Sequence, residues 1–527
     1  MLKSVSATEA RRGSVLFFLL AFGAAAALAL LPLDVMLGHF VIDDMFYYLR
    51  IAQHIVAGNG STFDGTEPTN GYHPGWMLIS VAFASFLQGE ALMRAVLLTA
   101  AALFGLQAAL LWRILARHCS LGVATGVTLL VILNWRSIAI TLGGLETPLA
   151  GAAVLLVLDY CDRHSAAPWD WRTRAWATVL LALAFYARVD LLLLVWSTLF
   201  WVLARDLLVW RTGTVRALAG VEVMTAGWLV LTAPWFAFSW ITSQAFLPNS
   251  RIAWSLLREM SLAAPTWGGE MLNQIRTSLS YLPDLANLLG LWPVAATEGA
   301  LVLVPVGLLG VAFVALAWML VRHRAAFPPM MWLALGFGAL VLGYYVLLHS
   351  PRVRYLYLGV LALAPVAAVA LDRARANGAG AARAVPALLA VLFVVSSVAG
   401  ADAWRKYQGS DHFHRYHPIL LQAALWLRDN GGGVPVGAWN GGILSYFSGA
   451  PVTNLDGVVN DAAIAAEKDQ ATDLYIRARG LKYLADVNTE RARYLRTFGS
   501  GTDVVGDVVA RFPLSAQSAV EIVKVRP

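Results

Sequence analysis

The chain has 527 residues, of which 59% are hydrophobic and 13% are charged. Soluble domains carry about 25% charged residues, so the composition excludes an ordinary string of globular domains and indicates a polytopic membrane protein. The net charge is +7, but most Lys and Arg lie in short connectors between apolar runs. The positive-inside bias of cytoplasmic loops accounts for this pattern, so no nucleic-acid partner is predicted. Cys119 and Cys161 lie at the ends of apolar runs and predict neither a disulfide nor a zinc site.

Residues 1–400 hold the apolar runs and are predicted to form an α-helical polytopic membrane domain. A spanning helix needs about 20 residues, and this length predicts about eleven spans. The first run is uncharged and is predicted to be a retained span, with the N-terminus in the cytoplasm and the C-terminus outside. Two polar segments are then extracytoplasmic, the first loop 34–73 and a second large segment 242–299. The apolar runs cover 14–33, 74–88, 91–112, 121–140, 145–160, 175–187, 190–204, 219–241, 300–321, 328–348, 355–371 and 385–400.

The order of these runs contains one conflict. Two runs, 74–88 and 91–112, lie between the first extracytoplasmic loop and the basic connector Arg113–His118. Two full crossings would return the chain to the outer side, where basic residues are disfavoured. Either one run does not cross the membrane fully, or the connector lies outside.

From about residue 401 the composition changes, because long apolar runs stop and charged residues become frequent. Short strand-like stretches such as Val434–Ala438, Val452–Leu455 and Val520–Val525 alternate with helical patterns. This alternation predicts a small α/β domain over 401–527, a length typical of one domain. With the C-terminus outside, this domain is extracytoplasmic.

Two adjacent acids, Asp43 and Asp44, lie in the first loop and are followed by an aromatic cluster that includes Tyr47. A helical pattern begins there and is predicted to end at Gly58-Asn59-Gly60. Acids at a membrane are costly and indicate a site. Adjacent helical residues point about 100° apart, so we expect one acid to be a general base. The other would bind a metal or cap the helix N-terminus.

Further polar side chains interrupt the outer ends of apolar runs. His73 opens one run and would hydrogen-bond a substrate or ligate a metal, or have a structural role. Glu146 either belongs to the site or caps the next helix, which Pro148 favours. Arg188 and Asp190 either neutralise each other or, facing a cavity, Arg188 would suit a phosphate.

Two more segments are predicted to lie on the same outer side. Arg352 and Arg354 break the positive-inside pattern, which indicates either an anionic ligand or contacts with lipid headgroups. Asn249, in Leu247-Pro248-Asn249-Ser250, follows a membrane exit and is a turn residue when considered alone.

Taken together, the ordered motifs resemble those of the C-type integral-membrane glycosyltransferases (GT-C) that use polyprenyl-phosphate sugars. The resemblance covers roughly the first half of the chain and is strongest to the branch of bacterial arabinofuranosyltransferases and mannosyltransferase-like enzymes. It implies that Asp44 or Asp43 is the base, and that Arg188, Arg352 and Arg354 bind the lipid phosphate. The motifs are Asp43-Asp44 with Phe46-Tyr47-Tyr48, Gly71-Tyr72-His73-Pro74-Gly75-Trp76, Gly144-Leu145-Glu146-Thr147, Arg188-Val189-Asp190 and Leu247-Pro248-Asn249-Ser250.

The function expected from these features is transfer of a sugar from a polyprenyl-phosphate donor to an envelope glycan, lipid or protein. It would take place at the outer face of a bacterial inner membrane. The first-loop acids are the catalytic candidates. The substrate-binding candidates are Tyr47, His73, Glu146, Arg188, Asp190, Asn249, Arg352 and Arg354. No organic cofactor is expected, and a divalent metal is compatible with the acids. The alternatives are a transporter or flippase of a lipid-linked sugar, although no internal repeat is present, and a non-catalytic glycan-binding envelope protein.

Overall fold

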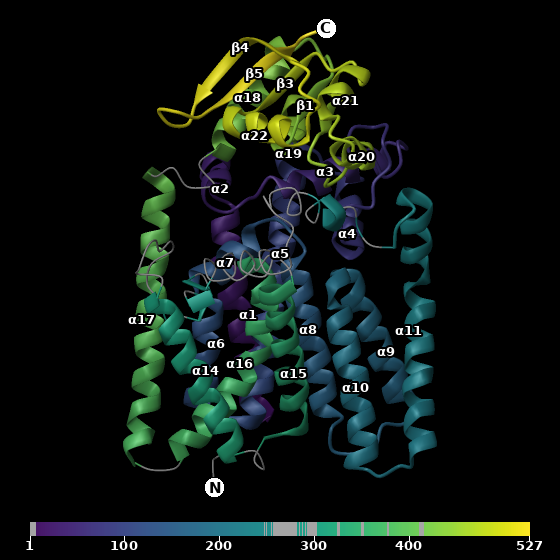
Figure 1. Ribbon diagram of the computed structural model, residues 1–527. Coiled ribbons are helices and arrows are strands. Elements are labelled where there is room, and N and C mark those ends of the chain that lie inside the picture. Colours follow the sequence, from purple (N-terminus) through teal and green to yellow (C-terminus); the bar gives the residue numbers. More distant parts are fainter. Residues whose placement is uncertain are drawn as a thin grey trace.

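The computed structural model describes residues 7–246, 303–323, 327–348, 352–376, 379–409 and 416–527, with short pieces between 248 and 291. Its long helices form one bundle, and a small domain with a β-sheet covers one end of that bundle (Figure 1). The N-terminus lies at the opposite end, while α2 and α3 lie between the bundle and the sheet domain. The predicted fold class, a helical membrane protein with a small C-terminal α/β domain, is confirmed.

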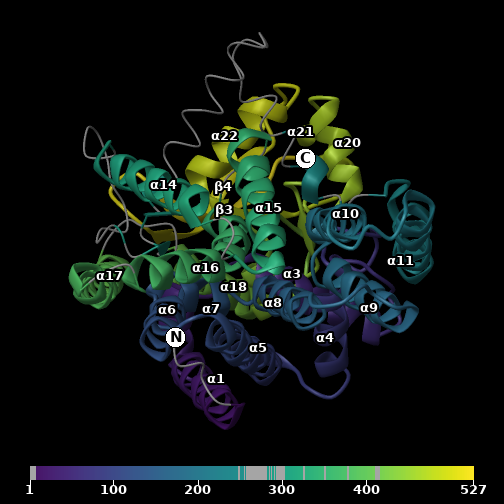
Figure 2. The same ribbon diagram turned by 90° about the horizontal axis from the view of Figure 1, so that it is seen from below.

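Seven helices in the described residues are long and apolar enough to cross a membrane, and the bent pair α6–α7 would make eight. Seen along the bundle, α11 and α17 lie on opposite sides of it (Figure 2). The bundle helices are α1 (Ala7–Ala29), α5 (Gly89–His118), α6 (Leu121–Ile132), α7 (Trp135–Leu142), α8 (Thr147–Arg163), α9 (Trp171–Ala187), α10 (Leu192–Leu208), α11 (Thr214–Ser243), α14 (Leu303–His323), α15 (Pro329–Gly343), α16 (Val353–Ala376) and α17 (Ala379–Gly409). Two short turns of other helix types, η1 (Val189–Leu191) and η4 (Tyr344–Leu348), lie beside α10 and α15.

Short helices are one reason why these counts, which cover the described residues only, fall below the predicted eleven or so spans. Helices α8 and α9 have 17 residues each, the lower limit of the range that spans a membrane core. Helix α4 (Pro74–Ala84) has 11 residues, which at 1.5 Å per residue reach about half of a 30 Å core. The run 74–88 therefore does not cross fully. A single crossing by α5 separates the first loop from Arg113–His118, which removes the conflict in the sequence pattern.

The end of the bundle away from the sheet holds a network of ion pairs. Asp159 is fully buried on α8 and pairs with Arg113, Arg117 and Arg163. Asp162 binds Arg117 through a 2.7 Å contact and also pairs with His118. The basic connectors predicted from the sequence are thus fixed to α8 by buried carboxylates, which is the arrangement that stabilises a buried charge.

The first loop is folded and contains α2 (Leu33–His39) and α3 (Asp44–Val56). Gly58 and Gly60 follow α3 with φ of +83° and +71°, a conformation that glycine adopts without steric cost. The predicted end of this helix is therefore confirmed. Loop residues after it form a bridge between Thr62 and Pro68, and the chain then enters α4 at Pro74.

The C-terminal domain is a five-stranded sheet with the order β2-β1-β3-β5-β4. Strands β2, β1 and β3 are parallel, with Val436 opposite Val452 and Tyr483, whereas β5 pairs antiparallel with β3 and β4. Helices follow each parallel strand, as crossovers between parallel strands require. The elements are α18 (Tyr416–Asn430), β1 (Val436–Ala438), α19 (Gly442–Ser448), β2 (Val452–Asn454), α20 (Asp461–Lys468), α21 (Thr472–Ala478), β3 (Tyr483–Val487), α22 (Asn488–Phe498), β4 (Val505–Pro513) and β5 (Ala519–Val525).

The two parts of the chain meet at the first loop. Helix α17 continues to Gly409, past the change in composition near residue 401. Arg479, at the end of α21, binds Asp64 and Glu67 of the first loop at 2.7 and 2.8 Å. The sheet domain is therefore attached to the loop that carries the predicted catalytic acids.

Candidate active site

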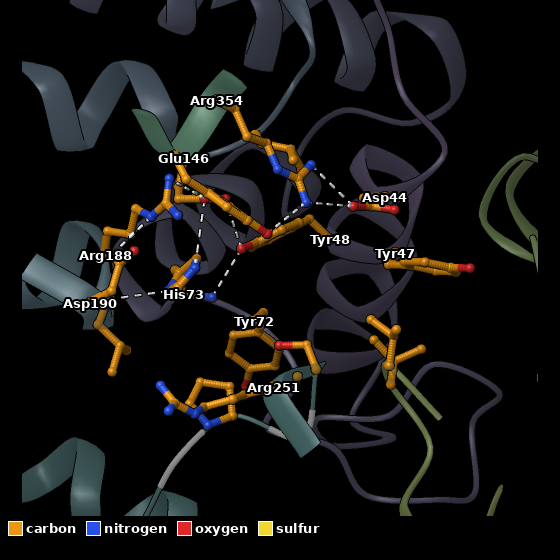
Figure 3. Close-up of a pocket in the computed structure, with 18 of the residues that line it drawn as sticks. Asp44, Tyr47, Tyr48, Tyr72, His73, Glu146, Arg188, Asp190, Arg251 and Arg354 are labelled. Atoms are coloured by element: carbon orange, nitrogen blue, oxygen red, sulfur yellow. Dashed lines mark hydrogen bonds and ion pairs between the residues drawn. The ribbon is translucent and has the colours of Figure 1, made fainter. Parts of the chain in front are cut away.

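A cavity of about 310 Å³ opens where the first loop, the bundle and the C-terminal domain meet. Side chains from α3, the entry to α4, the turn before α8, η1, η4 and the start of α16 line it, and Val458 and Val459 close it from the C-terminal domain. Figure 3 shows charged and aromatic side chains converging on it. Segments separated by hundreds of residues thus build one chamber that places charged side chains at the end of an apolar bundle.

The two adjacent acids have different surroundings, one in the cavity and one against the C-terminal domain. Asp44 is the first residue of α3, lines the cavity, and has a side chain that is 42% exposed. Arg354 donates to its Oδ2 at 3.3 Å (Figure 3). Asp43 is 4% exposed and turns to the C-terminal domain, where its carboxylate accepts from the amides of Gly442 and Ile443 at 3.0 and 2.7 Å. The two acids therefore point in different directions, as the helical geometry predicts.

The environment of Asp43 favours neither charge state strongly. Burial raises the pKa of Asp43 to about 7, and the two amide donors act in the opposite direction. The nearby carboxylates of Asp44 and Asp486 also raise it. The two amide contacts are those of a carboxylate that caps a helix, and they favour its ionised form against the effect of burial.

Glu146 is the centre of a second buried group, on the opposite wall from the C-terminal domain. Its carboxylate lies 3.6 Å from His73 Nε2 and 3.7 Å from Arg188, and it accepts a hydrogen bond from the Tyr48 hydroxyl at 3.3 Å. His73 Nδ1 accepts from the amide of Val189 at 3.2 Å, which leaves the proton of a neutral imidazole on Nε2. Burial lowers the pKa of His73, although Glu146 raises it. His73 Nε2 therefore faces the Glu146 carboxylate.

Arg188 is enclosed by opposite charge and by aromatic rings. Its side chain is 2% exposed and donates to Asp190 at 2.9 Å. The guanidinium carbon lies 4.6 Å from the centre of the Tyr355 ring, and the Arg354 guanidinium lies 5.1 Å from the same ring. The hydroxyl of Tyr345 contacts both Arg188 and Asp190. Two cations are thus held close together beside one ring, an arrangement that suits an anion between them.

Replacing Arg188 with Met is expected to lower the free energy of unfolding by about 3 kcal/mol, because it leaves the buried Glu146 carboxylate without its guanidinium partner. Thermal unfolding of the purified protein in detergent measures this loss. Arg428→Met is the control, since Arg428 pairs with Asp429 at the exposed surface. Equal melting temperatures for the two variants would contradict the structural role of Arg188.

The predicted site residues divide into those that the cavity brings together and those that it does not. Tyr47 lines the cavity, but its hydroxyl binds the C-terminal domain and points away from the Glu146 group (Figure 3). Arg352 precedes α16 and does not line the cavity. Asn249 lies outside the residues that the structure describes. The predicted residues that line it are Asp44, Tyr47, His73, Glu146, Arg188, Asp190 and Arg354.

Several lining residues were missed from the sequence. Arg251 lines the cavity and donates to the Tyr344 hydroxyl at 2.6 Å. Its position directly after the Pro-Asn-Ser motif was a usable signal. Tyr355 also lines the cavity, and its position next to Arg354 was a similar signal. Val458 and Val459 carry no chemical signal, because their role depends on how the C-terminal domain is placed over α3.

The described residues contain no group of three or more His, Cys, Asp or Glu side chains that could hold a metal ion. The carboxylates that line the cavity are instead paired with arginines.

The whole architecture is shared with solved membrane proteins. ArnT from Cupriavidus metallidurans, bound to undecaprenyl phosphate, superimposes with a TM-score of 0.58 at 15% identity, covering 96% of this chain and 97% of ArnT. The apo form of the same ArnT gives 0.56 at 15% identity and covers 98% of each chain. An oligosaccharyltransferase from Archaeoglobus fulgidus, tethered to an acceptor peptide, gives 0.54 at 12% identity, covering 96% of this chain and 74% of that one. The chain has the GT-C fold.

The GT-C fold extends over almost the full length, beyond the first half that carries the sequence resemblance. The predicted resemblance is confirmed at the level of the fold, and the branch within the class stays a prediction. Residues 405–523 match a family described as a domain of unknown function, DUF8728. No curated protein sequence matches the chain significantly. The GT-C bundle therefore carries a C-terminal domain whose role has to be argued from its contacts.

Proposed function

We propose that this protein is a glycosyltransferase that moves a sugar from a polyprenyl-phosphate donor to an acceptor hydroxyl in the cavity. The observation that carries the proposal is the pairing of Asp44 with Arg354 in a chamber at the end of the GT-C bundle. A partly exposed carboxylate beside the Arg354 guanidinium, with the buried Arg188 in the lining of the same cavity, would provide both a base and a phosphate site. The ArnT structure with undecaprenyl phosphate supports the class of donor.

The donor phosphate would bind among Arg354, Arg188 and Arg251, which contribute cations to the cavity lining. Nε of Arg354 and one terminal nitrogen of Arg188 are buried and make no hydrogen bond with other described residues. A phosphate oxygen that reached these donors would satisfy them and receive charge-assisted hydrogen bonds. The lipid tail would then leave the cavity along apolar helix surfaces, where it needs no polar contact.

In the reaction, Asp44 would accept the proton of the acceptor hydroxyl as that oxygen forms a bond to the anomeric carbon of the sugar. The bond between that carbon and the phosphate oxygen breaks, and its electron pair stays on the departing polyprenyl phosphate. The guanidinium groups then neutralise the charge that develops on the leaving group. The donor carries its own leaving group, so no nucleotide-binding element is required.

The proposed orientation places the cavity and the sheet domain on the extracytoplasmic side of a bacterial inner membrane. The network around Arg113, Arg117 and Arg163 lies at the other end of the bundle, and the positive-inside bias assigns that end to the cytoplasm. In this arrangement residues 1–400 form the membrane domain, with extracytoplasmic segments 34–73 and 242–299, and residues 401–527 form an extracytoplasmic domain. The acceptor is then an envelope glycan, lipid or protein.

The test is to incubate purified full-length protein in detergent with a panel of polyprenyl-phosphate pentoses and hexoses and envelope-glycan acceptors. Release of polyprenyl phosphate together with a glycosylated acceptor supports the proposal. A donor that raises the melting temperature but is never consumed would favour the transporter or the glycan-binding protein instead. Transport of the donor across proteoliposomes would then separate these two.

A further inference from the structure

The contact between α3 and the C-terminal sheet lies at an unusual place on that sheet. In open sheets with parallel strands, ligands bind at the carboxyl ends of the strands, where neighbouring connections leave in opposite directions. Here that edge is formed by the residues after β1, β2 and β3. The chain leaves β1 for β2 on one side and later returns as β3 on the other. Helix α3 of the first loop occupies this edge.

Two side chains make these contacts, Tyr47 of α3 and Asp43, the N-cap residue that precedes α3. Asp43 accepts from the first two amides of α19, Gly442 and Ile443. The Tyr47 hydroxyl donates to the Trp439 carbonyl at 3.2 Å and accepts from the amide of Gly441 at 3.2 Å. Asn454, at the end of β2, donates to the same hydroxyl at 3.3 Å. We refer to these contacts of Asp43 and Tyr47 as the α3–α19 contact.

Glycines permit the close approach. A Cβ on Gly442 would lie 2.3 Å from the Asp43 carbonyl oxygen, so no other residue fits at that position without a shift of the backbone. Gly71 of the first loop approaches in the same way, because a Cβ there would lie 2.1 Å from the Val458 carbonyl oxygen. The second approach brings Val458 and Val459 over the cavity. The two domains therefore approach each other closely at two places, at Asp43 and at Gly71.

Hydrogen bonds within the sheet domain fix the turn after β1 that contacts α3. Asp486, at the end of β3, accepts from the amides of Trp439 and Asn440, both at 2.8 Å, and from the Asn440 side chain at 3.0 Å. This buried carboxylate fixes the turn that presents the amide of Gly441 and the start of α19 to α3. The edge that binds ligands in comparable sheets therefore binds helix α3 in this protein.

We propose that the α3–α19 contact positions Asp44, so that the C-terminal domain is a working part of the catalytic unit and Asp43 is a positioning residue. The proposal rests on the proposed function for Asp44. Asp44 begins the helix whose preceding residue is fixed by α19, and its carboxylate must lie correctly against Arg354 and the acceptor. A displacement of about 1 Å at a reacting group can cost about 100-fold in rate.

The experiment compares Asp43→Ala and Asp43→Asn with Arg479→Gln in the full-length protein. Arg479 joins the same two domains through Asp64 and Glu67, which follow the C-terminal end of α3, so its loss is expected to weaken attachment without releasing Asp44. Asp43→Ala is expected to lower kcat about 10- to 100-fold with little change in donor KM. Asp43→Asn keeps one acceptor oxygen and is expected to fall between Asp43→Ala and the wild type. Arg479→Gln is expected to keep the wild-type kcat.

Amide hydrogen exchange gives a readout that does not need turnover. Asp43→Ala is expected to increase exchange both in 442–448 and in the first turns of α3, whereas Arg479→Gln leaves α3 protected. Equal exchange of α3 in the two variants, or an equal kcat, would overturn the inference. If α3 loses protection in Asp43→Ala but the wild type consumes no donor, the contact stands and the proposed transferase function is wrong.

Discussion

Asp44→Asn is expected to lower kcat for sugar transfer by about 1,000-fold, within the range that general acid–base groups contribute. The amide has nearly the shape of the carboxylate and can still accept a hydrogen bond from Arg354, but it cannot take a proton from the acceptor hydroxyl. Donor affinity should therefore change little, so the loss appears in kcat rather than in KM. Initial rates of polyprenyl phosphate release over a range of donor concentrations measure both quantities.

The matched control is Asp34→Asn. Asp34 is an exposed carboxylate in the same loop and does not line the cavity, so its replacement is expected to leave kcat unchanged. A thermal unfolding curve for each variant separates loss of chemistry from loss of folding. If folded Asp44→Asn protein turned over at a rate close to that of the control, Asp44 would not be the base. Glu146 would then be the next carboxylate to examine.

The sequence predicts that one of the two first-loop acids is the base but cannot decide which. Helical geometry separates the directions of Asp43 and Asp44, and this much is local. The structure distinguishes the two acids by the hydrogen bond between Asp43 and Gly442, which lie 399 residues apart in the chain. A contact of that separation leaves no periodicity or spacing in the sequence, so the assignment of Asp43 to the C-terminal domain required the folded structure.

The two arginines after α15 illustrate the same limit over a shorter distance. Their position on the side that should be poor in basic residues predicts an anionic partner. Arg352 precedes the first residue of α16, whereas Arg354 lies in its first turn, so the two side chains need not face the same cavity. The structure places Arg354 in the cavity, bound to Asp44. The charge pattern identified the segment, and the start of α16 at Val353 determined which residue faces inward.

The membrane part shows where hydropathy is sufficient and where it fails. Long runs such as those of α5 and α16 satisfy the length requirement and were predicted as spans. The run 74–88 is equally apolar, but α4 ends at Ala84, inside this run, and α5 begins only at Gly89. Hydropathy does not detect a turn inside an apolar run. The conflict in the positive-inside pattern left two explanations open, an incomplete crossing or an outer position of the basic connector, and the length of α4 supports the first.

Arg354→Gln is expected to weaken binding of undecaprenyl phosphate by about 30-fold or more, since truncating one partner of a buried charge pair costs about 2–5 kcal/mol. Its guanidinium donates to Asp44 and has a buried Nε that no described residue accepts from. A phosphate placed there would gain charge-assisted bonds that glutamine cannot supply. Titration of the purified protein with undecaprenyl phosphate, followed by thermal stabilisation, gives the dissociation constants.

Arg352→Gln is the matched control for this experiment, because it removes the same charge two residues away, outside the cavity. Both variants lower the net charge equally, so any general attraction of the anionic lipid to a basic protein changes by the same amount in each. A loss of affinity confined to Arg354→Gln would locate the phosphate beside Asp44, within reach of the proposed base. Equal losses in both variants would mean that long-range attraction explains the binding, and the phosphate site would have to be sought elsewhere in the cavity, at Arg188 or Arg251.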